Sequence, residues 1–232
     1  MGRLTFGCAE KLNGDCSYSS CQNAELKLRL SYAVSMPQDA PDLRRKLNSV
    51  AIRQAGYFTA EQAREVGYSY QAQKYHVDRG NWTRVDRGIF RIPDWPARGD
   101  DVYVLWRLWS RDRAVVSNES ALALHELGDV NPLRVHLTVP SGFRSTHPAV
   151  VLHPGVLPSE DVEEREGYRL TTPERTLLDT AGGDTSQEQL DVAMADAIDR
   201  GLIHPRRLRE RSDEFGDRAA LRIERALGKV AR

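Results

Sequence analysis

Long polar and basic side chains gather between Ser69 and Arg91, at spacings that suit contact with nucleic acid. Amide and hydroxyl groups near the start of a helix can hydrogen-bond to base edges in a major groove. Arginines on a hairpin can reach phosphates or a minor groove. The sequence therefore predicts a DNA-binding surface made of Ser69, Tyr70, Gln71, Gln73, Lys74, Arg79, Arg84, Arg87 and Arg91.

The sequence offers no comparable set of groups for catalysis. Its six histidines are scattered, and none is paired with another at the helical spacing of four residues that a metal site needs. No glycine-rich phosphate loop and no G-x-S-x-G motif occurs, and the acidic run Glu160–Glu164 is typical of a solvated loop. We predict that the chain is not an enzyme, with no catalytic residue, no metal and no cofactor.

Two short helices must position the helical part of this surface. Thr59 and Gln62 have the spacing of a capping box, and Gly67 suits the residue after a helix end. Ser69 can cap a second helix that runs to Arg79, a pattern typical of a helix-turn-helix. On that second helix we expect base contacts from Tyr70, Gln71, Gln73 and Lys74, and packing from Ala72, Tyr75 and Val77.

A basic hairpin follows the two helices. The runs 82–85 and 89–92 alternate in the manner of strands, and Asp86-Arg87-Gly88 forms a short connection between them. Before the pair of helices, residues 42–55 place apolar side chains on one helical face. The order predicts a winged helix-turn-helix over residues 41–92. A small α+β scaffold with a solvated basic surface is the alternative.

The distribution of charge separates this module from the rest of the chain. The whole sequence is neutral, but residues 42–92 hold ten basic and five acidic side chains, and residues 93–232 hold nineteen basic and twenty-four acidic ones. Residues 93–100 combine prolines and a glycine, as a linker does. We therefore predict a basic DNA-binding domain, a linker at 93–100 and a second domain at 101–232.

Residues 1–40 lack a sustained apolar period, and we predict a disordered tail there. The tail contains all three cysteines, at spacings that match no zinc motif. Met36 is a plausible alternative start. The sequence shows no signal peptide and no apolar run long enough for a membrane, so we expect a cytoplasmic location.

The second domain is predicted to be α+β, with a small sheet followed by C-terminal helices. The pattern favours strands near 133–139, 149–153 and 166–170, with His136 and His153 on adjacent strands. Helices are expected at 102–113, 117–128, 172–182, 186–201, 205–211 and 217–230. Arg175 and Asp179 lie four residues apart and should share a helical face, where we expect a structural ion pair more than a contact with a partner.

These motifs together resemble the AbiEi-type abortive-infection antitoxins. In the first half the resemblance is carried by Gly56-Tyr57-Phe58-Thr59 to Gly67 and by Arg87–Ile92. In the second half it is carried by Asn118–Gly128, by Val135–Val139 and above all by Thr171–Asp179. It covers about residues 42–200, and the order of the two halves is more specific than the winged half alone.

The resemblance implies a transcriptional autorepressor that binds repeats in its own promoter, in double-stranded DNA. It also implies an antitoxin domain that counteracts a nucleotidyltransferase-like toxin, and no association with a membrane. Two alternatives stay open: a regulator whose second domain senses a ligand without any toxin partner, and a relic of a nuclease-associated defence protein. The acidic motif that such a nuclease would need does not occur in the C-terminal helices.

Overall fold

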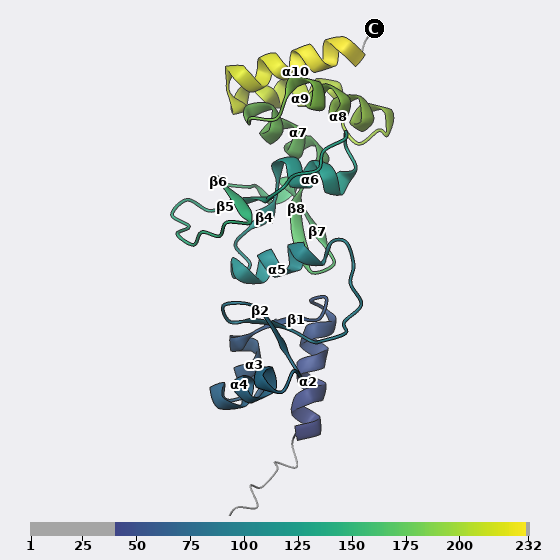
Figure 1. The fold of residues 1–232 in the computed structure, drawn as a ribbon. Coiled ribbons are helices and arrows are strands. Elements are labelled where there is room, and N and C mark those ends of the chain that lie inside the picture. Colours follow the sequence, from purple (N-terminus) through teal and green to yellow (C-terminus); the bar gives the residue numbers. More distant parts are fainter. Residues whose placement is uncertain (1–39, 231–232) are drawn as a thin grey trace, which may run out of the picture. The chain divides into compact units, whose positions relative to one another are not determined.

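The computed structural model describes residues 40–230 (Figure 1). The predictions for the N-terminal tail, its cysteines and Met36 concern residues outside that range. Within it, the fold is α+β, with an N-terminal winged helix-turn-helix followed by a mixed domain, as predicted. None of the described helices is long and apolar enough to cross a membrane.

The winged domain has the predicted order of elements. Its three strands form an antiparallel sheet in the order β1-β3-β2, which closes the hairpin of β2 and β3 against the first strand. The elements are α2 (Ala40–Ile52), β1 (Tyr57–Thr59), α3 (Ala60–Val66), α4 (Tyr70–Asp78), β2 (Thr83–Asp86) and β3 (Ile89–Arg91).

Local hydrogen bonds explain where α3 and α4 begin. The Gln62 main-chain N–H donates to the Thr59 side chain, and the Thr59 N–H donates to the Gln62 side chain, which completes the predicted capping box. The Ala72 N–H donates to Ser69 Oγ at the start of α4. Gly67, with a φ of 122°, makes the turn between them, in a backbone region that side chains with a Cβ rarely adopt.

Aromatic side chains form the core of the winged domain. Phe58 is fully buried, and its ring lies 4.9 Å from that of Trp82 in an edge-on arrangement. Tyr68, in the turn before α4, contacts Trp82 at 5.0 Å. Trp82 precedes the hairpin, so one indole ring fixes both the turn before α4 and the base of the wing.

The second domain contains a five-stranded sheet in the order β6-β5-β4-β8-β7. Strand β4 lies at its centre, where it pairs antiparallel with β5 and parallel with β8. The helices and strands of this part are α5 (Asp101–Trp109), β4 (Val115–Val116), α6 (Asn118–His125), β5 (Val135–Val139), β6 (Val150–Pro154), η1 (Ser159–Asp161), β7 (Val162–Arg165) and β8 (Tyr168–Thr171).

The prediction of a solvated loop at 160–164 is wrong. Asp161 ends a short 3-10 helix and is buried, and Val162–Arg165 forms the edge strand β7, paired with β8. Glu163 and Glu164 tolerate a strand here because β7 lies at the edge of the sheet, where charged side chains remain hydrated. Strand β4 was also not predicted, because two residues are too short for an alternating pattern.

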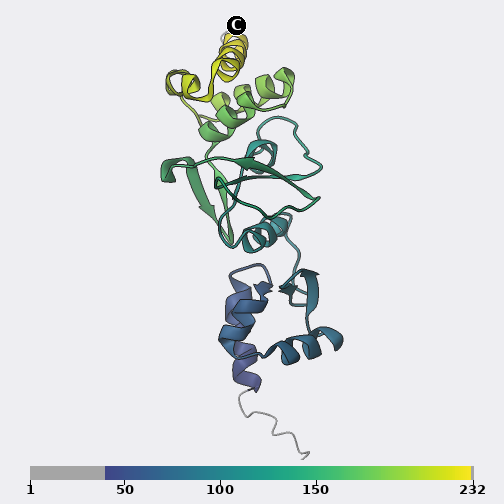
Figure 2. The ribbon, with the colours of Figure 1, turned by 90° about the vertical axis from the view of Figure 1, so that its left-hand side faces the viewer.

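Four helices complete the domain and form one group in Figure 2: α7 (Pro173–Gly182), α8 (Gln187–Asp199), α9 (Pro205–Ser212) and α10 (Asp217–Val230). Their core includes the buried side chains of Leu177, Leu178, Met194 and Ile223. Thr172 accepts a hydrogen bond from the Arg175 N–H at the start of α7, and proline follows at the first helical position, as expected.

Candidate nucleic-acid interface

Helix α4 presents part of the predicted surface to solvent. Tyr70 is 65% exposed, and Gln71 and Lys74 are also exposed. Arg64 of α3 donates to the Tyr70 hydroxyl at 3.2 Å, and its guanidinium lies 5.0 Å from the ring centre. Lys74 Nζ lies 2.6 Å from Asp78 Oδ2, an exposed pair that competes only weakly with a phosphate.

Gln73 does not belong to this exposed surface. It is 3% exposed, and its amide nitrogen donates to the main-chain oxygens of Ala60 and Tyr68 at 3.0 and 3.2 Å. In this conformation it holds α4 against the start of α3 and the turn. The expectation that Gln73 faces base edges is therefore corrected to a structural role.

Tyr75 departs from the sequence expectation in the opposite direction. We expected it to pack, but it is 54% exposed, and the Arg79 guanidinium lies 5.4 Å from its ring centre. Ala72 and Val77 are half-buried. The exposure of Tyr75 could have been predicted from the sequence, because Gln71 and Tyr75 are four residues apart and share one helical face. Tyr75 and Arg64 are the interface candidates that the sequence prediction missed.

The hairpin arginines fall into two groups. Arg84 and Arg87 are exposed, and the Asp86 carboxylate accepts a hydrogen bond from the Arg87 main-chain N–H at 2.6 Å, which stabilises the turn. Arg91 is half-buried, lies 4.8 Å from the ring centre of Tyr57 and pairs with the buried Asp101 at 2.5 Å. The expectation that Arg91 contacts phosphate is corrected, because its charge already has a buried partner.

Salt dependence should separate these two groups. Arg84→Ala or Arg87→Ala is expected to lower the slope of log affinity against log salt by about one unit, because each removes one phosphate contact. Arg91→Ala should leave that slope unchanged and lower the melting temperature, because Asp101 loses its partner. Titrations of duplex DNA at several salt concentrations measure the slopes. Equal slopes for Arg84→Ala, Arg87→Ala and the parent would show that the hairpin faces away from DNA.

A second polar cluster lies in the α+β domain, where the sequence indicated only Arg175 and Asp179. Arg175 Nε donates to Asp179 at 2.8 Å, and Nη1 donates to Asp161 at 3.0 Å. Arg211 of α9 also donates to Asp161, at 2.8 and 2.9 Å, and pairs with Glu174 at 2.6 Å. The cluster therefore ties η1 and helices α7 and α9 together, as the structural interpretation of Arg175 expects.

The two buried carboxylates of this cluster differ in pKa. Burial alone raises the pKa of Asp161, but the hydrogen bonds from Arg211 and Arg175 outweigh burial and hold that pKa below its usual range. Burial raises the pKa of Asp179 to about 6, because the single arginine beside it compensates only in part. Asp179 Oδ2 is buried without a hydrogen-bond partner in the described part of the chain.

The pKa of Asp179 has a consequence for stability. Between about pH 4 and pH 6 the folded chain holds a proton on Asp179 that the unfolded chain has released, so this group makes stability fall as pH rises. Asp179→Asn is expected to remove that contribution. Urea denaturation of both proteins across pH 4–7 measures it. The same difference in free energy of unfolding between the two proteins at every pH would contradict the raised pKa.

The two histidines predicted on adjacent strands lie side by side in β5 and β6. The rings of His136 and His153 are stacked at 5.2 Å, with 3.2 Å between two ring nitrogens. Burial lowers the pKa of both, which favours neutral rings at neutral pH. Within residues 40–230, no group of three or more histidine, cysteine or acidic side chains is arranged to hold a metal ion.

The fold and the exposed basic face of the first domain define the class: a winged-helix DNA-binding regulator with a second α+β domain. Residues 45–93 match the family model described as "Transcriptional regulator, AbiEi antitoxin", and residues 114–229 match "AbiEi antitoxin C-terminal domain". The chain belongs to the AbiEi antitoxin family. It is thus a DNA-binding antitoxin of the transcriptional-regulator kind, and the matches indicate no enzymatic family.

The fold is also similar to a solved structure, the RV2827C protein from Mycobacterium tuberculosis. The TM-score is 0.51 at 16% sequence identity, and the similarity covers 82% of each chain. At that identity the likeness concerns the fold alone. No match to a curated protein was found.

Proposed function

We propose that this antitoxin represses its own operon by binding repeats in the promoter through the winged domain. The observation that carries the proposal is the exposed set on α4 and the wing, together with the excess of basic residues in this domain. Tyr70, Gln71 and Lys74 are exposed on one element, and Arg84 and Arg87 on the other. Operator binding needs a helix that contacts base edges and, beside it, cationic side chains that contact the DNA phosphates.

The remaining predicted contacts fit the same arrangement. Ser69 uses its hydroxyl to cap α4, which leaves its exposed backbone at the helix N-terminus, a favourable position for a phosphate. Arg79 is exposed at the other end of α4, beside Tyr75. We therefore propose Ser69, Tyr70, Gln71, Lys74, Arg79, Arg84 and Arg87 as the DNA contacts. The domain boundaries at 41–92 and 101–232, with a linker between them, remain predictions.

We further propose that the second domain counteracts a nucleotidyltransferase-like toxin. This proposal rests on membership of the antitoxin family and on the match of residues 114–229 to its C-terminal domain. The excess of acidic residues in the second half disfavours contact with DNA, which favours a protein as its partner.

A paired experiment tests both proposals. The full chain is titrated onto its own upstream promoter and onto random duplex, and it is co-expressed with the neighbouring gene in a growth assay. Tighter binding to the promoter than to random duplex and rescue of growth are both expected, and the Arg84→Ala/Arg87→Ala double variant should lose promoter binding while it keeps rescue. Loss of rescue by that variant would mean that neutralisation acts through transcription alone. Equal affinity for promoter and random duplex would exclude operator recognition.

A further inference from the structure

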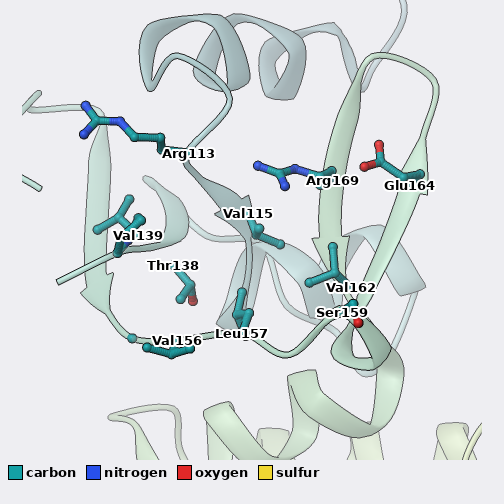
Figure 3. A pocket seen from close by; sticks show the side chains of 12 residues that line it. Arg113, Val115, Thr138, Val139, Val156, Leu157, Ser159, Val162, Glu164 and Arg169 are labelled. Carbon is teal, nitrogen blue, oxygen red and sulfur yellow. The ribbon is translucent and has the colours of Figure 1, made fainter.

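One face of the five-stranded sheet is hollowed where strands β4, β5, β7 and β8 meet the segment 155–159 (Figure 3). The hollow has a volume of about 590 Å³, within the range of sites for small molecules. Its lining is mostly apolar, from the side chains of Val115, Val139, Val156, Leu157 and Val162.

Strand alternation explains why Val115 and Arg169 face the hollow. Val116 and Leu170 pair across β4 and β8 and lie in the core that α5 covers. Their neighbours Val115 and Arg169 therefore point to the opposite face of the sheet, where they line the hollow. No helix in Figure 3 lies over these side chains.

Two arginines without a carboxylate partner lie along one side of the hollow. Arg113 Nε donates to the Ser110 main-chain oxygen at 3.2 Å, and its guanidinium lies 4.7 Å from the Phe143 ring centre. Arg169 Nη2 donates to the main-chain oxygen of Asp112. Within residues 40–230 the polar contacts of these two arginines are with main-chain oxygens, and neither guanidinium is paired with a carboxylate beside the apolar floor.

In the described part of the chain, Arg169 lacks an ion pair even though an acidic residue lies opposite it in the sheet. Glu164 lies directly opposite Arg169 in the β7–β8 register, where an ion pair would normally form. Instead the Arg169 side chain turns away from Glu164 toward the hollow, and Glu164 lies 3.7 Å from Arg107. Two arginines and one acidic residue therefore line the polar part of the hollow, and the carboxylate of that acidic residue, Glu164, lies near Arg107.

We propose that this hollow binds a small amphipathic anion, with an apolar body on the valine and leucine floor and a carboxylate or similar group at Arg113 and Arg169. Guanidinium groups favour oxyanions because they donate hydrogen bonds and carry charge together. Nucleic acid does not fit, because the floor is apolar and the second half of the chain is net acidic. Such a ligand would be additional to DNA and to a toxin partner, and no proposed DNA contact lines the hollow.

The test uses the full chain and the fluorescent probe anilinonaphthalene sulfonate, which has aromatic rings and one anionic group. We expect saturable binding at one site, with displacement by decanoate at least tenfold more effective than displacement by decanol. Arg113→Gln and Arg169→Gln should each weaken decanoate about tenfold, the size expected for one partly exposed charge-assisted contact, and leave decanol unchanged. Arg206→Gln, exposed on α9 and away from the lining, serves as the matched control.

A second pair of variants tests the same site at a position where substitution should not affect folding. Val156 is 81% exposed at the edge of the hollow, so substitutions there should not disturb the fold. Val156→Asp should weaken decanoate more than Val156→Asn, which differs only in charge. Equal displacement by decanoate and decanol, or unchanged affinity in both arginine variants, would overturn the proposal. The proposal would also be overturned if the two arginine variants lost toxin rescue but still bound decanoate normally. The hollow would then be a binding site for a segment of the toxin.

Discussion

Replacement of Asp161 by asparagine is expected to lower the free energy of unfolding by about 3–5 kcal/mol at neutral pH. The Asp161 side chain is 1% exposed and accepts hydrogen bonds from Arg175 and Arg211, which are themselves 13% and 19% exposed. An amide of the same shape removes the negative charge and leaves two mostly buried guanidiniums with weaker compensation. Urea denaturation measures the loss, and the melting temperature should fall by about 10 °C for a chain of this size.

The control for this prediction is Asp184→Asn. Asp184 is fully exposed, at 3.7 Å from an exposed Arg218, and exposed pairs contribute about 0–1 kcal/mol. An effect for Asp161→Asn no larger than that for Asp184→Asn would show that water or side-chain rearrangement compensates the cluster. DNA affinity of the folded Asp161→Asn protein should remain unchanged, because the cluster belongs to the second domain.

Replacement of Gln71 and of Gln73 by alanine should have different consequences, although both residues are glutamines of α4 and only two positions apart. Gln71→Ala is expected to lower the preference for the operator over random duplex by about 1–3 kcal/mol and to leave stability unchanged, because its side chain is exposed. Gln73→Ala should lower stability by about 1–3 kcal/mol, because the main-chain oxygens of Ala60 and Tyr68 lose their donor.

Parallel measurements of operator affinity, random-duplex affinity and thermal melting test this pair. Each variant is the other's control, since both shorten a glutamine on the same helix. A loss of discrimination in Gln73→Ala without a change in melting would show that Gln73 leaves its buried position to read a base. An unchanged ratio of affinities in Gln71→Ala would remove Gln71 from the reading surface.

The sequence predicted the winged domain well because its signals are local. The capping residues Thr59 and Ser69 and the glycine turn at Gly67 act over three or four residues, and the structure contains all of them. The prediction of which face of α4 is exposed was weaker. Gln73 is polar enough for a surface, yet its amide satisfies two main-chain oxygens, and only the packing of α3 against α4 determines that.

The contacts that the sequence could not predict join residues far apart in the chain. Asp161 and Arg211 are separated by fifty positions in the sequence, and only the tertiary fold brings their side chains together. Arg91 appeared available for DNA because its partner, Asp101, belongs to the following helix. Side-chain chemistry indicates what a residue can bind, whereas tertiary structure decides whether that capacity is already used inside the protein.

The central position of β4 also affects the order in which the chain can fold during synthesis. Its two residues pair with β8, more than fifty positions later, so the sheet stays incomplete until Thr171 has left the ribosome. The three strands of the winged domain lie within residues 57–91, and their pairing needs no later segment. A chain that terminates after residue 91 but before Thr171 would contain all the proposed DNA contacts but only part of the second domain. Under the proposed function, translation that stops early would therefore yield DNA-binding fragments that lack the toxin-neutralising domain.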